Sequence, residues 1–261
     1  MMRVRLCRMM RARVFVTAEA VGRALALDVA RRLTQQPDTV LGLPTGRTPI
    51  PLYRELVRLH QAGRVDFSRA TTFNLDEFRG LRAVDPRSYR AFMRHHLFDH
   101  VNLSPRRIHI LDGAARDAER ESEHYERAIE RAGGIDLMIL GLGINGHIGF
   151  NEPGRSLVAR THCTRLTPGT RRANAALFGN RASAVPREAL SIGMATILHA
   201  KRVVLLATGA SKARSVARMI EGPVTTRLPA SFLQLHRNIE IWLDRAAAGH
   251  LGDPERVALH R

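Results

Sequence analysis

The sequence predicts one α/β domain built on a mostly parallel sheet, and three observations support this fold class. The chain has 261 residues, of which 44% are hydrophobic, so its length suits one large domain or two small ones. Apolar runs of strand length alternate with helical stretches, an order that implies parallel strands joined by right-handed crossovers. The runs are apolar almost throughout, as expected when helices cover both faces of the sheet.

Six short runs, rich in apolar or β-branched residues, predict the strands. In chain order they are 38–43, 69–75, 107–111, 135–143, 201–209 and 239–244. The fourth run, IDLMILGLG, is the most apolar of them. Open parallel sheets bind ligands beyond the carboxyl ends of their strands, so the residues that follow each run are the first place to look for a site.

Helical spacing marks most of the stretches between these runs. We expect helices over 51–63, 89–101, 115–133, 187–200 and 211–222. In the first of them, Leu52, Leu56 and Leu59 form one apolar face, and Gly63 ends the pattern. The third is long and amphipathic and ends in the same way, at Gly133.

The formal net charge of +17 raises the question of a nucleic-acid partner. Lysine occurs only at positions 201 and 212, and the arginines are spread along the chain instead of gathering in a tail. No zinc-finger spacing and no aromatic-rich RNA-binding strand is present. We therefore expect no nucleic-acid partner, although a positive field helps to collect a small anionic metabolite. The longest apolar runs are too short to cross a bilayer, so we expect no membrane partner either.

The two ends of the chain carry no motif of their own. Residues 1–13 are interrupted by arginines and lack the continuous apolar core of an export signal, so we expect them to be disordered or extended. We expect the domain to occupy 14–245, with 246–261 as a C-terminal tail. Cys7 and Cys163 fit unpaired thiols in a reducing compartment, which predicts a cytoplasmic protein.

The stretch GLGINGHIGFNEPG at 141–154 has the glycine spacing of a dinucleotide-binding turn. Gly141, Gly143 and Gly146 fit G-x-G-x-x-G, and an apolar strand precedes them. A dinucleotide turn also needs a helix directly after the glycines and an acidic residue about 20 positions further on. Pro153 falls where the helix interior would be, and the later segment contains no acid. We therefore reject an NAD site and expect the glycines to bend the backbone around a small ligand.

Polar groups follow the first two runs. After the first comes PTGRTP, in which Thr48 is a good helix N-cap and Pro49 a good first helical residue. A glycine turn that feeds a helix N-terminus is suited to bind an anion, although this one is not a Walker loop. After the second come Asp76 and Glu77, and we expect one of these carboxylates to act as a base in a cleft.

The fourth and fifth runs are followed by a histidine with a glutamate and by a lysine. An imidazole is suited to acid–base chemistry near neutral pH, and Glu152 can orient that of His147. A metal site formed by these two with Asp76 is an alternative, but no HExxH-type spacing supports it. Lys212 stands beside a glycine turn, where an ammonium can pair with phosphate. The four strand ends together predict acid–base chemistry on a small phosphorylated molecule.

These residues resemble the glucosamine-6-phosphate deaminase family, also called the glucosamine-6-phosphate isomerase family. The matching strings are LGLPTGRTP (41–49), TTFNLDEFRGL (71–81), DPRSYRAFM (85–93), LGLGINGHIGFNEPG (140–154), TRRAN (170–174) and LPASFLQLH (228–236). They lie in the family's order, and the LDE and GHIGFNEP blocks are specific. The resemblance implies a single Rossmann-like three-layer α/β/α domain, a mobile lid over 160–186 and no cofactor.

The resemblance also implies a reaction, the conversion of glucosamine 6-phosphate and water to fructose 6-phosphate and ammonia. Asp76 matches the base that moves a proton between C2 and C1. His147 matches the acid–base group that opens the sugar ring, and Glu152 matches its carboxylate partner. The positions that match the phosphate site are Thr45, Gly46, Thr48 and Lys212.

Departures from the family pattern carry further expectations. The catalytic position that is Asp in some members is Asn145 here, so only Glu152 is left to act on His147 by charge. The family usually has glycine where Arg47 stands and arginine where Ala176 stands. We expect Arg47 to replace the missing cation, and the alternative is that it points to solvent while Arg171 or Arg172 takes this role.

Allosteric members bind N-acetylglucosamine 6-phosphate partly through an arginine and a lysine, at positions that hold His162 and Thr164 here. We therefore expect hyperbolic kinetics, and the sequence leaves a homo-oligomer open. Three other functions remain as alternatives. A galactosamine-6-phosphate deaminase/isomerase shares the NGH, NEPG and PASFLQLH strings. A 6-phosphogluconolactonase shares the glycine–histidine block but not the LDE and FNEP strings. A non-catalytic sugar-phosphate sensor would not need both catalytic groups.

Overall fold

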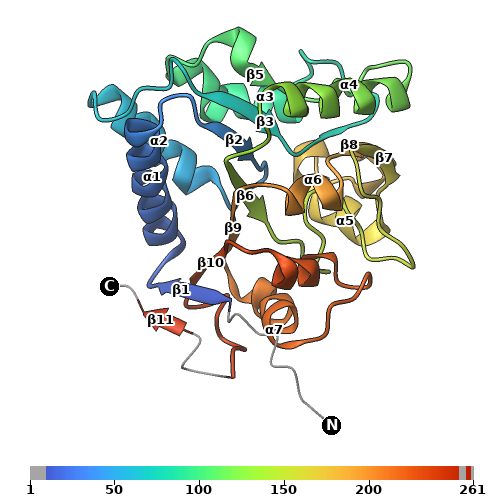
Figure 1. Cartoon of the computed structure of the whole chain (residues 1–261). Helices are drawn as coiled ribbons and strands as arrows, with labels where there is room; N and C mark the ends of the chain where they lie inside the picture. The colour runs from blue at the N-terminus through green and yellow to red at the C-terminus, as the bar shows by residue number, and fades with distance from the viewer. Residues whose placement is uncertain (1–9, 253–256, 260–261) are drawn as a thin grey trace.

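The structure is a computed structural model that describes residues 10–252 and 257–259. The expectation for residues 1–9 lies outside the described residues. Eight strands form one sheet in the order β11-β1-β10-β9-β6-β2-β3-β5, and every neighbouring pair is parallel. The strands are β1 (Arg11–Phe15), β2 (Val40–Leu43), β3 (Thr71–Asn74), β5 (Ile108–His109), β6 (Leu137–Gly141), β9 (Arg202–Ala207), β10 (Ile239–Asp244) and β11 (Val257–Leu259). The predicted α/β class and parallel sheet are confirmed (Figure 1).

The strand order reverses direction beside β2. From β2 the chain adds β3 and β5 toward one edge, and it then returns to add β6, β9 and β10 on the other side of β2. Right-handed crossovers that run in opposite directions place their helices on opposite faces of the sheet. The loops that leave the carboxyl ends of β2 and β6 therefore run toward opposite faces of the sheet, and a crevice lies between them.

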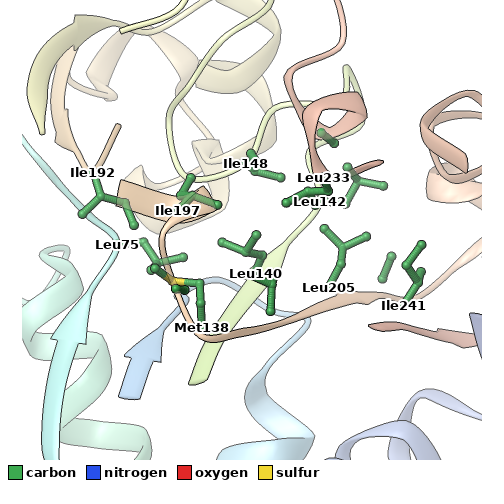
Figure 2. Close-up of a cluster of buried hydrophobic side chains, with 14 of the residues drawn as sticks. Leu75, Met138, Leu140, Leu142, Ile148, Ile192, Ile197, Leu205, Leu233 and Ile241 are labelled. Atoms are coloured by element: carbon green, nitrogen blue, oxygen red, sulfur yellow. The ribbon is translucent and has the colours of Figure 1, made fainter. Parts of the chain in front are cut away.

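Helices cover both faces of this sheet and divide the hydrophobic core into two halves. One face carries α1 (Ala18–Gln35), α2 (Ile50–Gln61) and α3 (Tyr89–His96), and the other carries α4 (Ala118–Arg131), α6 (Met194–Leu198) and α7 (Ala213–Glu221). Side chains of β6 alternate between the halves, because successive strand residues point to opposite faces. Leu137 and Ile139 pack with the first group, whereas Met138 and Leu140 pack with the second, the half drawn in Figure 2.

The expected helix over 187–200 is wrong in its first half. Glu188–Ser191 form β8, and the helix α6 begins only at Met194. β8 pairs antiparallel with β4 (Asp76–Phe78) on one side and with β7 (His162–Arg165) on the other, which gives a separate three-stranded sheet. These partners are distant in sequence, so the local spacing of apolar residues did not reveal the pairing.

Two helix boundaries also differ from expectation. α2 begins at Ile50 with Pro49 as its N-cap and without a side-chain cap hydrogen bond, so the prediction that Thr48 caps this helix is wrong. α3 ends at His96, and a 3-10 turn follows at Phe98–His100 where a continuous helix was expected. The other predicted strands and helices are present; the strand over 239–244 has the predicted bounds, and the rest are shortened by a few residues.

Several elements were not predicted from the sequence. β1 and α1 precede the first predicted strand, and α1 starts at an N-cap, Thr17, whose hydroxyl accepts a hydrogen bond from the Ala20 amide at 3.1 Å. Part of the C-terminal segment belongs to the sheet, because β11 pairs with β1. The expected lid over 160–186 contains β7 and a short helix, α5 (Pro168–Ala173). No helix in the described part of the chain is both long and apolar enough to span a bilayer.

Candidate active site

A cavity of about 380 Å³ lies at the carboxyl ends of β2, β3, β6 and β9, in the crevice where the strand order reverses. Seven of the nine residues expected in the site line it: Thr45, Gly46, Arg47, Thr48, Asp76, His147 and Lys212. The other two, Asn145 and Glu152, do not line it but contact His147. The rule that ligands bind beyond strand ends therefore located this cavity from the sequence.

The loop after β2 forms one wall of the cavity. Gly46 has a φ of +88°, a conformation that side-chain-bearing residues rarely adopt, so glycine is needed for this turn. The Tyr53 hydroxyl donates a hydrogen bond to the Pro44 carbonyl and anchors the start of the loop. The Thr45 hydroxyl donates to Asp76 Oδ1 at 3.4 Å, which ties this loop to the carboxylate that follows β3.

Asp76 and Glu77 are adjacent in sequence but have different surroundings. Asp76 lines the cavity and is only 7% exposed. Burial, followed by the charge of Glu77, raises the pKa of Asp76 to about 7, while the hydrogen bond from Thr45 opposes this shift. A carboxyl group with such a pKa exchanges a proton readily near neutral pH, which suits general acid–base catalysis.

Glu77 has a structural role. Its carboxylate accepts hydrogen bonds from the backbone amides of Phe78, Tyr89 and Arg90 at 2.8, 2.9 and 3.0 Å. Two of these amides belong to the first turn of α3, so Glu77 satisfies donors that the helix leaves unpaired. The position at a strand end left open which of the two acids faces the cleft, whereas the family resemblance pointed to Asp76, and it is Asp76 that lines the cavity.

His147 is held by polar contacts on the side away from the cavity. Its Nδ1 lies 3.6 Å from Glu152 Oε2 and 3.4 Å from the Thr170 hydroxyl. The Asn145 side chain links Glu152 to the backbone of His147. Its Nδ2 donates to Glu152 Oε2 at 2.8 Å, and its Oδ1 accepts from the His147 amide at 3.2 Å. A neutral amide thus fixes the carboxylate and the backbone of the histidine together.

Glu152 is ionised at neutral pH. Burial acts to raise its pKa, but the hydrogen bond and charge of His147, with hydrogen bonds from Thr170 and Asn145, outweigh burial and lower the pKa to about 2. Thr167 adds a hydroxyl contact to Glu152 Oε1 at 3.3 Å. The carboxylate therefore stabilises a positive charge on His147, as an acid–base histidine requires.

The glycines of GLGINGHIGFNEPG serve the placement of His147. A Cβ atom added to Gly143 would lie 2.5 Å from ring atoms of His147, so only glycine leaves room for the imidazole. Gly146 has a φ of +87°, which turns the chain back toward the cavity. No helix follows these glycines before α5 begins at Pro168. The backbone thus lacks the helix that a dinucleotide-binding turn requires directly after its glycines, which agrees with the rejection of an NAD site.

Two cations without a counter-ion face the cavity. Lys212 is half-buried, and burial, followed by the charge of Arg47, lowers its pKa to about 8. Within residues 10–252 and 257–259, neither Lys212 nor Arg47 forms an ion pair with a carboxylate. Two neighbouring positive charges in a partly desolvated cavity favour a bound anion with more than one negative charge.

Sequence reasoning missed several lining and supporting residues. Tyr89 and Asn174 line the cavity, and the Tyr89 hydroxyl donates to Asn174 Oδ1 at 3.3 Å. Thr167 and Thr170 hold the Glu152–His147 pair. Three of these four residues lie in the segment 160–186. Two of them, Thr170 and Asn174, belong to the string TRRAN, whose match to the family could have identified them as site residues. Among the described residues, no three His, Cys, Asp or Glu side chains are grouped so as to hold a metal ion.

A family model described as glucosamine-6-phosphate isomerases/6-phosphogluconolactonase matches residues 15–242. The chain belongs to this family. A glucosamine-6-phosphate deaminase of Halothermothrix orenii is 50% identical over 226 residues, which cover 87% of this chain and 93% of that protein. One from Thermoanaerobacter sp. (strain X514) is 44% identical over 242 residues, which cover 93% of this chain and 95% of that protein. The resemblance seen in the sequence is confirmed.

Solved structures share the fold. One described as a monomeric glucosamine-6-phosphate deaminase has a TM-score of 0.89 and 42% identity, over 92% of this chain and all of that one. The 6-phosphogluconolactonase from Trypanosoma cruzi has a TM-score of 0.75 and 19% identity, over 94% of this chain and 97% of that one, and it shows the fold alone. Because the first of these is described as monomeric, it lends no support to a homo-oligomer.

Proposed function

We propose that this chain is a glucosamine-6-phosphate deaminase, which converts glucosamine 6-phosphate and water to fructose 6-phosphate and ammonia. One observation carries the proposal: a carboxyl group with a pKa raised to about 7, an oriented imidazole and two cations that form no ion pair among the described residues line the same cavity. The deaminases of 44–50% identity, whose full length this chain nearly covers, support the same reaction.

The cationic side of the cavity would bind the phosphate. Lys212 and Arg47 supply positive charge, and the turn at Thr45–Thr48 supplies hydroxyl and backbone donors. Binding at this end fixes the rest of the sugar relative to Asp76 and His147. Phosphate binding energy is thereby used to orient the reacting carbons.

His147 would open the sugar ring. A base takes the proton from the C1 hydroxyl and an acid delivers one to the ring oxygen, and an imidazole performs both steps near neutral pH. Glu152 stabilises the protonated form by charge, and Asn145 keeps both groups in place. The product of this step is the open-chain aldehyde with its amine on C2.

Asp76 would then carry a proton from C2 to C1. Its ionised carboxylate removes the C2 proton, and the electron pair forms the C1–C2 double bond of an enolamine. The electrons of the C1 carbonyl double bond move to O1, which takes up a proton as the protonated amine on C2 releases one. The same group returns the proton to C1, which leaves a C2 imine that water hydrolyses to the ketone and ammonia. C1 is reduced as C2 is oxidised, so the atoms and electrons balance within the substrate. Proton transfer of this kind contributes roughly 10²–10⁴-fold to the rate.

The decisive experiment measures ammonia release from glucosamine 6-phosphate, with galactosamine 6-phosphate and 6-phosphogluconolactone as alternative substrates. The PASFLQLH string shared with galactosamine enzymes forms the 3-10 segment Pro229–Leu235 and does not line the cavity, so it gives no reason to prefer the galacto epimer. We expect ammonia from the gluco substrate and its loss in Asp76→Asn. Faster lactone hydrolysis, or a wild-type protein without ammonia release, would refute the proposal.

A further inference from the structure

A second cavity, of about 700 Å³, lies at the end of the small sheet, beyond the last residue of β4. Its lining is strongly basic. The charged residues that line it are Arg79, Arg87, Arg165, Arg187 and Glu188. None of these residues lines the candidate active site, and the reaction proposed there uses none of them.

The pairing of three strands brings the charged residues together. Arg165 on β7 pairs in register with Glu188 on β8. Arg79 directly follows β4, and its amide donates to the Glu188 carbonyl at 3.0 Å. Side chains directly opposite each other on antiparallel strands point to the same face of a sheet. The two arginines therefore flank the glutamate, and Arg187 directly precedes β8.

The charges in this cavity do not balance. Arg87 is neutralised by Asp85, with Nη2 and Oδ2 2.6 Å apart. In the part of the chain that the structure describes, Arg79, Arg165 and Arg187 form no ion pair with a carboxylate. Three guanidinium groups are thus set against one carboxylate in a concave surface.

Some arginines elsewhere in the molecule are paired with a carboxylate instead. Arg58, for example, pairs with Glu55 at 2.7 Å, and Arg127 pairs with Glu123 at 3.3 Å, each one turn away on the same helix. Exposed ion pairs of this kind contribute little to the free energy of folding. Arg165 ends β7, Arg79 follows β4 and Arg187 precedes β8. These three arginines, which have no carboxylate partner among the described residues, repel one another, and a bound anion relieves that repulsion.

Apolar groups complete the cavity. Phe178 and Leu81 line it and are both buried to more than nine-tenths. The Arg87 guanidinium lies 5.5 Å from the centre of the Phe178 ring, a cation–π contact that holds the ring in place. Small-molecule sites typically combine such apolar walls with a few charged groups in volumes of roughly 300–1,000 Å³.

We propose that this pocket binds an organic phosphate that carries at least two negative charges. Guanidinium groups bind phosphate oxygens through two parallel hydrogen bonds, and several arginines can divide the oxygens of one di- or triphosphate between them. The apolar wall receives the organic part of the ligand. The proposal does not depend on the reaction at the active site, because the two cavities share no lining residue.

The test uses isothermal titration calorimetry at low ionic strength, with ADP, pyrophosphate and adenosine as probes. The titrations use an Arg47→Ala/Lys212→Ala background, so that the active-site cations do not contribute. We expect ADP to bind this background protein, pyrophosphate to bind more weakly and adenosine not to bind measurably. Adding Arg165→Ala and Arg187→Ala should weaken ADP binding about tenfold or more, because each lost guanidinium removes charge-assisted hydrogen bonds.

The matched control adds Arg69→Ala and Arg106→Ala, which remove two exposed arginines outside both cavities. It should leave ADP affinity within about twofold, because screening weakens distant charges at the surface. Thermal unfolding of each variant checks that the fold is retained. Absence of ADP binding to the background protein, equal affinity for ADP and pyrophosphate, or equal losses in the test and control variants would overturn the proposal.

Discussion

The titration of Asp76 tests the proposed chemistry directly, because its neighbours perturb the pKa in known directions. Burial, followed by the charge of Glu77, raises the pKa to about 7, and the hydrogen bond from Thr45 lowers it. Thr45→Val keeps the branched shape of the side chain and removes the hydroxyl that stabilises the ionised carboxylate. The pKa of Asp76 should therefore rise in this variant.

The size of the shift follows from the length of the hydrogen bond. Hydrogen bonds to charged groups contribute about 1.5–3 kcal/mol, and neutral ones about 0.5–1.5 kcal/mol. The contact between Thr45 Oγ1 and Asp76 Oδ1 is long, at 3.4 Å, so we take about 0.7 kcal/mol for it. One pKa unit corresponds to about 1.36 kcal/mol, which gives a rise of about half a unit.

In the proposed reaction Asp76 removes the C2 proton in its ionised form, so activity should fall as pH drops below about 7 in the wild type. In Thr45→Val this acidic limb should lie about half a unit higher. The assay is kcat/KM for ammonia release as a function of pH. Thr45→Ser, which keeps the hydroxyl, is the control, and ionisation of the substrate phosphate is common to all three proteins. Coincident limbs for the valine and serine variants would refute the reasoning.

Three further results are expected. Lys212→Ala should raise KM for the sugar phosphate by about 10–100-fold and Arg47→Ala by less, since Lys212 is half-buried and Arg47 is exposed; equal KM values in wild type and both variants would exclude the cationic phosphate site. Gly143→Ala should lower kcat by about 10²-fold by displacing His147, whereas Gly141→Ala, whose added Cβ meets nothing within 4 Å, should not. Initial rates should depend hyperbolically on substrate, and a sigmoidal curve that N-acetylglucosamine 6-phosphate relieves would contradict this.

The sequence predicted those parts of the fold that depend on local pattern. Buried strands of a parallel sheet appear as short apolar runs, and all six predicted runs contain strands of the main sheet. β8 was mistaken for a helix because its partners, β4 and β7, lie far from it in the chain. Strand pairing of this kind is decided by tertiary contacts, which a short window of sequence does not contain.

The residues of the candidate site were likewise predicted only where their position follows from the order of the strands. Side chains at strand ends were found because topology alone brings those ends together. Thr167 and Thr170 were missed because their role is a contact with Glu152 and His147, which are separated from them by a loop and by β7. The exchange of Arg47 for the family's usual arginine stays a prediction, although its effect on the pKa of Lys212 fits a cation near the phosphate site.

The small sheet explains how one of two adjacent acids becomes available for catalysis. In β4, Asp76 pairs with Ser191 and Glu77 with Leu190, and successive residues of a strand point to opposite faces. One face meets the cavity, and the other meets the first turn of α3, whose backbone amides bind the second carboxylate. A one-residue slip of this pairing would exchange the two acids. The register of β4 with β8, which the sequence did not reveal, therefore selects Asp76 as the proton carrier of the proposed reaction.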